Sequence, residues 1–191
     1  AQFAEDASPM AHPVRPDQYA EINNFYTLTV YEKGAEVVRM MQTLVGRSGF
    51  AAGMTEYFAR HDGNAVTCDD FAQAMADANP TSALAQHLEA FKRWYSQAGT
   101  PRVQLRLTHD AAQRTLHLSA QQSCPATPGQ PHKQPFVIPL TVAMLDGGGQ
   151  PLLTRLDQPS GLACHEHVLV LTEAEQGFTL HDVPHDAVLS A

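Results

Sequence analysis

Cysteine is scarce in this sequence, and its few cysteines lie far apart. Cys68, Cys124 and Cys164 are the three among 191 residues. An odd and sparse count does not build the disulfide framework of a small secreted domain. We therefore expect a reducing compartment, and the cytoplasm is the predicted location.

Basic charge and long apolar runs are lacking as well. The formal net charge is -8, and no basic cluster provides the face that phosphate binding needs. No apolar run approaches the roughly 20 residues of a membrane span. The opening residues, AQFAEDASPM, lack a starting Met and the basic and apolar regions of a signal peptide. We expect neither nucleic acid nor a membrane as a partner, and the missing Met suggests a processed or excised chain.

Several common catalytic motifs are also absent. The sequence has no nucleophile elbow, no phosphate-binding loop and no glycine-rich dinucleotide motif. It does have apolar content: 43% of its residues are hydrophobic, which supports a real core and argues against disorder. A length of 191 residues suits one large domain or two small ones.

The first half of the chain has helical periodicity. Apolar residues recur at three- and four-residue steps, which is typical of helices with one buried face. Gly46 is expected to end one helix, and Thr67 with Asp70 predicts a variant capping box at the start of another. Residues 1–22 hold several prolines and are expected to be irregular, either packed against the rest or loose. The expected helices cover about 27–46, 49–60, 68–78 and 82–97.

After residue 100 the apolar period changes to two. VQLRLTH and RTLHLSA each alternate apolar with polar side chains, and the DAAQ between them predicts a hairpin turn. Residues 124–135 contain four prolines and are expected to form a loop. Further short strands separated by turn signals suggest an immunoglobulin-like β-sandwich. The predicted fold class is α+β in two regions: a helical bundle over residues 1–98 and an all-β sandwich over 99–191.

The tetrapeptide CHEH at 164–167 is a candidate zinc site. His165 and His167 are two residues apart, which would place both side chains on one face of a strand. A zinc site needs further ligands, and the nearest further histidines, His181 and His185, are only loosely placed. We favour a polar strand edge over a metal site, because short isolated motifs often match by chance.

Other chemistry-bearing residues lie at helix boundaries. His61, Asp62, Asp69 and Asp70 are expected to cap helices, since Asp at such positions satisfies unpaired backbone amides. Cys68 lies in the first turn of a helix, where a thiolate would be favoured. No histidine follows it at a spacing that suggests a base, so a half-buried structural residue is expected.

The stretch NNFYTLTVYEKGAE, residues 23–36, has more polar and aromatic groups than a helix start needs. The phenol of Tyr31 can donate a hydrogen bond to a developing oxyanion, and Tyr26 and Asn23 precede it closely. The alternative is that Tyr26 and Tyr31 are core aromatics whose hydroxyls bond to the backbone. Spacing alone favours packing, because aromatic stripes at helix starts usually pack.

Four segments together resemble a known family. HPVRPD, NNFYTLTVYEKGAEVVRM, YFARHDGNAVTCDDF and FKRWYSQAGTP are similar to the zinc aminopeptidase N family, specifically its bacterial branch. The resemblance spans residues 12–103 almost continuously. It implies the tail of a thermolysin-like catalytic domain followed by a small β-sandwich and, beyond it, a large helical domain. It also implies a zinc-dependent hydrolase that removes N-terminal amino acids from peptides.

The resemblance implies roles for individual residues. Tyr31 matches the family's catalytic tyrosine, which stabilises the tetrahedral oxyanion beside zinc when water attacks the scissile carbonyl. Tyr26 matches an aromatic residue that lines the pocket for the first substrate side chain. Asn23 matches a residue near that pocket, and Glu32 follows the tyrosine without an assigned role.

Two motifs of the family do not occur in this sequence. The HExxH zinc motif and the GxMEN motif that recognises the free amine are both absent, and in the family they lie upstream. We therefore expect an inactive fragment that binds no zinc itself, because the metal, the activated water and the general base are missing. Its expected partners are the missing catalytic lobe, the C-terminal helical domain and, through exposed apolar surface, other copies of the chain. The alternative is a non-catalytic scaffold that docks neighbouring domains, in which Tyr31 need not reach the surface.

Overall fold

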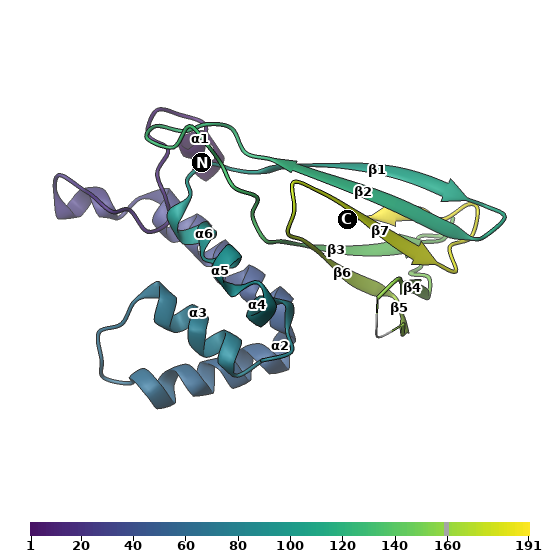
Figure 1. Ribbon diagram of the computed structural model, residues 1–191, viewed down its shortest axis with the longest axis horizontal. Helices are drawn as coiled ribbons and strands as arrows, with labels where there is room; N and C mark the ends of the chain where they lie inside the picture. Colours follow the sequence, from purple (N-terminus) through teal and green to yellow (C-terminus); the bar gives the residue numbers. More distant parts are fainter. Residues whose placement is uncertain (159–160) are drawn as a thin grey trace. The chain divides into compact units, whose positions relative to one another are not determined.

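The structure, a computed structural model, describes residues 1–158 and 161–191, and the chain forms two compact units (Figure 1). Each unit is built from two segments: Ala1–Pro101 with Cys124–Val137, and Arg102–Ser123 with Ile138–Ala191. The first unit contains the helices and the second contains the strands. This division confirms the predicted fold class.

The helical unit begins earlier than the sequence pattern predicted. A short helix forms before the first proline, although residues 1–22 were expected to be irregular throughout. None of the helices in the described residues combines the length and apolarity that crossing a bilayer requires. The helical elements are α1 (Gln2–Asp6), η1 (Ile22–Phe25), η2 (Thr29–Lys33), α2 (Gly34–His61), α3 (Cys68–Asp77), α4 (Ala83–Gln86), α5 (Leu88–Phe91) and α6 (Arg93–Ser96).

The long helix α2 is interrupted at Gly46, where the sequence predicted a break. Gly46 has a φ of 74° and a ψ of 167°, which lie outside the helical range and which residues with a Cβ rarely adopt. On both sides of the kink one face is buried, and Val37 and Met41 are completely inaccessible to solvent. The two helices expected over this region are therefore present, joined end to end.

Helix α3 packs beside the second half of α2 (Figure 1). Its capping box forms as predicted: the Thr67 hydroxyl accepts from the amide of Asp70, and the Asp70 carboxylate accepts from the amide of Thr67. The two helices approach closely at Gly53, where an added Cβ would lie 2.3 Å from the sulfur of Met75. A side chain larger than hydrogen at residue 53 would require Met75 to move.

The prediction of one continuous helix over 82–97 is wrong. The segment forms three short helices, α4, α5 and α6. His87, which has a φ of -122°, separates α4 from α5. The apolar face is nevertheless the predicted one, because Leu88, Phe91 and Trp94 are all buried. Periodicity therefore predicted which side chains face the core and not the continuity of the backbone.

The proline-rich segment after the first hairpin belongs to the helical unit. The indole of Trp94 stacks on Phe136 with ring centroids 4.1 Å apart. The indole N–H donates to the carbonyl of Val137 at 2.8 Å, and the guanidinium of Arg93 donates to the carbonyl of Pro135 at 2.7 Å. These contacts hold the segment against α6.

The strand unit contains two antiparallel sheets in the described residues. One has the strand order β1-β2-β7-β4-β5, and the other has the order β6-β3-β8. The predicted hairpin is present, since β1 pairs with β2 along its whole length (Figure 1). The strands are β1 (Arg102–Asp110), β2 (Thr115–Ser123), β3 (Ile138–Leu145), β4 (Thr154–Leu156), β5 (Ala163–Cys164), β6 (Glu166–Leu171), β7 (Glu175–His181) and β8 (Val188–Ser190).

Burial follows the two-residue period on β2 and β6. Leu116, Leu118 and Ala120 of β2 are buried, as are Leu169 and Leu171 of β6. Alternate residues of a strand face the same side of a sheet, so these side chains form the core of the unit. Among the strands that the structure describes, the outer strand β1 pairs with β2 alone, and it is no more than half-buried.

Candidate active-site surface around Tyr31

Tyr31 lies in the middle of η2, a π-helical turn that leads into α2. Such turns contain one residue more than an α-helical turn and are found frequently at functional sites. The side chain is 61% exposed. Tyr26, five residues earlier, is 57% exposed. The packing role that spacing favoured for these two tyrosines is therefore wrong.

The two tyrosines lie side by side on the surface of the helical unit. Their ring centroids are 6.3 Å apart, with an angle of 32° between the ring planes. Tyr26 also makes an edge contact with Phe25, which makes another with Tyr19. Tyr31 is thus the last member of a row of aromatic rings that solvent can reach.

Asn23, the third residue expected to contact substrate, lies in η1. Its side chain is exposed, and its amide donates to the carboxylate of Glu21 at 2.9 Å. The structure therefore brings Tyr26 and Tyr31 together and directs the Asn23 amide toward Glu21.

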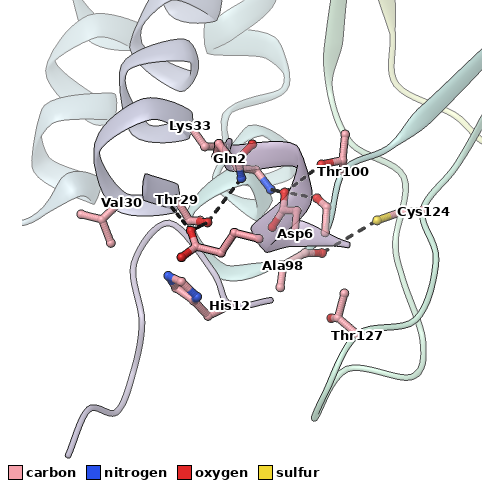
Figure 2. Close-up of polar contacts among 12 residues, drawn as sticks. Gln2, Asp6, His12, Thr29, Val30, Lys33, Ala98, Thr100, Cys124 and Thr127 are labelled. Carbon is pink, nitrogen blue, oxygen red and sulfur yellow. Dashed lines mark hydrogen bonds and ion pairs between the residues drawn. The ribbon is translucent and has the colours of Figure 1, made fainter. Parts of the chain in front are cut away.

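The π-turn is capped by a residue that is distant in sequence. The carboxylate of Glu5, on α1, accepts from the amide of Thr29 at 2.8 Å and from its hydroxyl at 2.6 Å. The side-chain amide of Gln2 donates to the same hydroxyl at 3.3 Å. Thr29 itself is completely buried. Figure 2 shows α1 beside the start of the turn, and its Glu5 carboxylate satisfies the first backbone donor of η2, the amide of Thr29.

A buried ion pair anchors the other end of the π-turn. The ammonium of Lys33 lies 2.8 Å from the carboxylate of Asp6 and donates to the carbonyl of Gly99, also at 2.8 Å. The hydroxyl of Thr100 donates to the same Asp6 oxygen (Figure 2). Burial raises the pKa of the Asp6 carboxyl, but the hydrogen bond and the charge of Lys33 outweigh it and leave the pKa below its ordinary value. Asp6 is therefore ionised at neutral pH.

A third anchor holds the residues just before the turn. The Thr27 hydroxyl accepts from the amide of Val30, and the Thr27 carbonyl accepts from the amide of Tyr31. Nδ1 of His12 lies 2.8 Å from the Met10 carbonyl, which can only accept, so in a neutral imidazole Nε2 is the acceptor for the Thr27 hydroxyl at 2.7 Å. The backbone that carries Tyr31 is thus fixed while its phenol faces solvent.

The anchoring residues were not identified from the sequence. Glu5 and Asp6 belong to a segment that was expected to be irregular. Lys33 left one signal, because it lies four residues before the buried Val37 on the apolar stripe of the helix. A lysine at such a position requires a buried partner that compensates its charge.

The CHEH motif does not form the pair of ligands that its spacing suggested. His165 lies at a bend between β5 and β6 and is exposed, whereas His167 is buried beside Thr154 and Cys164. The bend breaks the alternation that would have placed both rings on one face. Among the residues that the structure describes, no three His, Cys, Asp or Glu side chains gather closely enough to hold a metal ion. The residues present therefore do not fit zinc.

Cys68 is half-buried at the start of α3, as expected. Burial raises the pKa of its thiol above the ordinary value, and the nearby charge of Arg15 only partly opposes this. The thiolate that a helix N-terminus would favour is therefore not favoured here.

Comparison with known families agrees with the two units of the fold. Residues 1–94 match the peptidase family M1 domain, and residues 99–191 match a domain of unknown function (DUF3458) with an Ig-like fold. The structure is also similar to that of Legionella pneumophila aminopeptidase A in complex with aspartic acid, with a TM-score of 0.71 and 21% identity. That similarity covers 96% of this chain and 19% of the other, and it concerns the fold alone. The chain therefore joins a segment that matches the family M1 peptidase domain to an Ig-like domain.

Curated relatives narrow this assignment. The chain is 50% identical over 183 residues to aminopeptidase N of Escherichia coli (strain K12), and 47% identical over 182 residues to aminopeptidase N of Haemophilus influenzae. Each match covers 95% of this chain and 20% of the relative. The chain belongs to the bacterial aminopeptidase N family, which confirms the resemblance found in the sequence. It spans about a fifth of the length of these relatives.

Proposed function

We propose that this chain is part of a zinc aminopeptidase that removes N-terminal amino acids from peptides in the cytoplasm. In this proposal Tyr31 donates a hydrogen bond to the oxyanion that forms when water attacks the scissile carbonyl. The observation that supports it is the exposed Tyr31 phenol on an anchored π-turn. We also propose that the boundary between the peptidase part and the sandwich lies between residues 98 and 99.

The anchoring contacts suit a residue that stabilises a transition state. A donor contributes most when it is already oriented, because no free energy is then spent on reorganisation during the reaction. Thr29 and Lys33 flank Tyr31 at a distance of two residues and both are buried in polar contacts with α1. The phenol is thus directed outward from a fixed backbone, and its O–H is available for a substrate oxygen.

Tyr26 is proposed to line the pocket for the first side chain of the peptide. Its exposed ring lies next to that of Tyr31, so an apolar group beside the scissile bond would reach both rings. Asn23 is proposed to lie at the edge of this pocket, where its exposed amide can contact the peptide once it leaves Glu21.

The chain alone is proposed to be inactive. It has no HExxH motif and no GxMEN motif, and the described residues offer no cluster that fits zinc. The test is to assay the pure 191-residue chain with N-terminal amino acid anilides, with and without added zinc. No release is expected. Zinc-dependent release above that of a heat-denatured control would overturn the proposed inactivity.

The parent activity needs a separate test, which is the sequence of the gene upstream of Ala1. An HExxH helix followed by a helix-borne glutamate is expected there, and the longer protein should release N-terminal residues. If the upstream sequence lacks these residues, the assignment as part of a zinc aminopeptidase fails.

A second candidate function is domain docking, and an apolar groove on the helical unit favours it. The groove has a volume of about 670 Å³, and its lining includes Phe3, Leu28 and Met40. Phe3 is 74% exposed and Leu28 is 44% exposed. Exposed apolar side chains around a groove are typical of interaction surfaces. The proposed occupants are the remaining catalytic lobe in the longer protein and a second copy of the chain when it is alone.

Sedimentation velocity over a range of concentrations tests this second function. The isolated chain is expected to associate, and replacing Phe3 and Leu28 together by serine should make it monomeric. Phe58→Ser is the matched control, because Phe58 is 54% exposed on the helical unit but does not line the groove. A wild-type chain that stays monomeric at all concentrations would contradict the docking surface.

A further inference from the structure

A cysteine and a histidine lie within hydrogen-bonding distance in the strand unit. Sγ of Cys164, the last residue of β5, is 3.3 Å from Nδ1 of His167 on β6. The other ring nitrogen of His167 is 2.9 Å from the hydroxyl of Thr154 on β4. Thr154 is also the β-pairing partner of Cys164. A thiol, a base and a third group that orients the base are thus connected by consecutive hydrogen-bonding contacts in space. Sites that activate a nucleophile have the same arrangement.

The base in this group is held in a fixed orientation. His167 is 4% exposed and Thr154 is completely buried, so neither side chain can rotate without disturbing the core. If Nε2 of His167 donates to Thr154, then Nδ1 is the nitrogen without a proton and it faces the thiol. Cys164 is only half-buried, so part of the residue is open to solvent and to a small reagent.

The histidine is in the protonation state that a base needs. Burial lowers the pKa of His167, and a hydrogen bond to the backbone of Thr154 opposes this only in part. The imidazole is therefore neutral near pH 7 and can accept a proton. The Glu166 carbonyl, 3.0 Å from the same sulfur, is the competing acceptor for the thiol hydrogen, and it cannot remove that proton.

The other two thiols lack this arrangement. Among the described residues, Cys164 alone has a histidine nitrogen within hydrogen-bonding distance of its sulfur. Burial raises the pKa of both Cys68 and Cys124. The Cys124 thiol donates to the carbonyl of Ala98 at 3.8 Å, and a carbonyl cannot take the proton. The three cysteines should therefore differ strongly in reactivity.

We propose that Cys164 is a modification site that forms a mixed disulfide with small-molecule disulfides, with His167 as the base. The sulfur of Cys164 attacks one sulfur of the reagent, and a new S–S bond forms while the original S–S bond breaks. The leaving thiolate takes the electron pair of the broken bond. The thiol proton passes to Nδ1 of His167 and then to the leaving thiolate, so Cys164 is oxidised and half of the reagent is reduced. This site belongs to the strand unit and does not depend on the role proposed for Tyr31.

The first test uses the wild-type 191-residue chain and glutathione disulfide. The modified residue is identified by peptide mass spectrometry at several reaction times, without reducing agent. We expect Cys164 to be modified at least about tenfold faster than Cys68 or Cys124, which is less than the roughly 10²–10⁴-fold that a positioned base can contribute. Equal rates at the three cysteines, or faster reaction at either of the others, would overturn the proposal without any variant.

The second test measures the contribution of His167. In a chain with Cys68→Ser and Cys124→Ser, the reaction of Cys164 with 5,5′-dithiobis(2-nitrobenzoate) is followed by release of the coloured thiolate. His167→Gln keeps a hydrogen-bonding side chain but removes the base, and it is expected to slow this release by about tenfold or more. His165→Gln is the matched control, because it removes an exposed histidine that lies outside this group, and it should retain the wild-type rate.

Loss of structure would change the second test in the opposite direction. An unfolded chain exposes its thiol and reacts faster, so slower release in His167→Gln cannot arise from unfolding. Circular dichroism of each variant verifies that it is folded. An unchanged rate in a folded His167→Gln chain overturns the role of the histidine. If that variant unfolds, Thr154→Val replaces it, and an unchanged rate in the folded Thr154→Val chain counts against the proposal in the same way.

Discussion

Lys33 and Asp6 form a buried ion pair beneath the π-turn that carries Tyr31. The ammonium and the carboxylate are 2.8 Å apart, and the two residues are only 8% and 5% exposed. The pair joins the last residue of η2 to the last residue of α1. The segment before the first proline is therefore part of the structure that orients Tyr31, although it contacts the tyrosine only through its neighbours.

Replacing Asp6 with asparagine should destabilise the helical unit. The variant leaves the Lys33 ammonium buried without a counter-charge, and removing one partner of a buried pair costs about 3–5 kcal/mol. Urea unfolding followed by circular dichroism at 222 nm measures the change. Glu36→Gln is the matched control, because the Glu36–Arg39 pair is exposed and such pairs contribute at most about 1 kcal/mol. Equal effects of the two substitutions would contradict the anchoring role of Asp6.

The same carboxylate predicts how stability depends on pH. The pKa of Asp6 is lower in the folded chain than its ordinary value, because the contacts with Lys33 outweigh the effect of burial. A lowered folded pKa contributes stability that is complete above the unfolded pKa, about 3.9, and is lost as the pH falls through the folded pKa. The helical unit should therefore lose stability below about pH 4.

Asp6→Asn provides the comparison for this pH dependence. The variant is less stable at neutral pH but should lose less additional stability on acidification, so its difference from wild type narrows below about pH 4. Stability at each pH is measured by urea unfolding. A constant difference from pH 7 to pH 3 would show that Asp6 does not carry the predicted shift.

The CHEH motif should not hold zinc. His165 is exposed and His167 is engaged with Thr154 and Cys164, so the two rings do not converge. Metal analysis of protein purified without chelators is expected to find well under one equivalent of zinc. His165→Ala should leave the zinc content and stability unchanged, whereas His167→Ala should destabilise the strand unit because its ring is buried. Stoichiometric zinc that both substitutions remove would contradict this prediction.

Local rules predicted much of the fold from the sequence. Gly46 and the pair Thr67 with Asp70 acted as expected because a positive φ and a capping box depend on a few neighbouring residues. The β1–β2 hairpin also followed from its two-residue period. The helix over 82–97 was predicted to be continuous, because apolar spacing does not report a local interruption such as His87.

The candidate site was harder to predict from the sequence, for a physical reason. The Glu5 contact with Thr29 joins residues 24 positions apart, and the Lys33 contact with Asp6 joins residues 27 apart. Capping rules consider only neighbouring residues, so they could not find these partners. Spacing also could not show that Tyr31 is exposed, since helical periodicity does not apply across a π-turn that adds one residue.

The role proposed for Tyr31 predicts a specific kinetic effect in the longer, active protein. Tyr31→Phe keeps the ring and removes only the hydroxyl, so a substrate should bind almost as well while the oxyanion loses its donor. Removing one such donor costs about 10²–10³ in kcat. Assays with N-terminal amino acid anilides should therefore show a large fall in kcat and a small change in KM. Tyr19→Phe is the matched control, since it removes a hydroxyl from an exposed tyrosine of the same aromatic row and should leave both constants unchanged.

Glu5→Gln in the same protein separates orientation from chemistry. This change leaves the Tyr31 phenol intact but weakens the cap on Thr29, whose amide and hydroxyl both donate to the Glu5 carboxylate. A partial fall in kcat is expected, smaller than that of Tyr31→Phe, because the donor is present but less well fixed. The double variant should be no slower than Tyr31→Phe alone, since the cap acts only through the phenol. Additive losses in the double variant would show that α1 affects catalysis by another route, and an unchanged kcat in Tyr31→Phe would remove the tyrosine from the reaction.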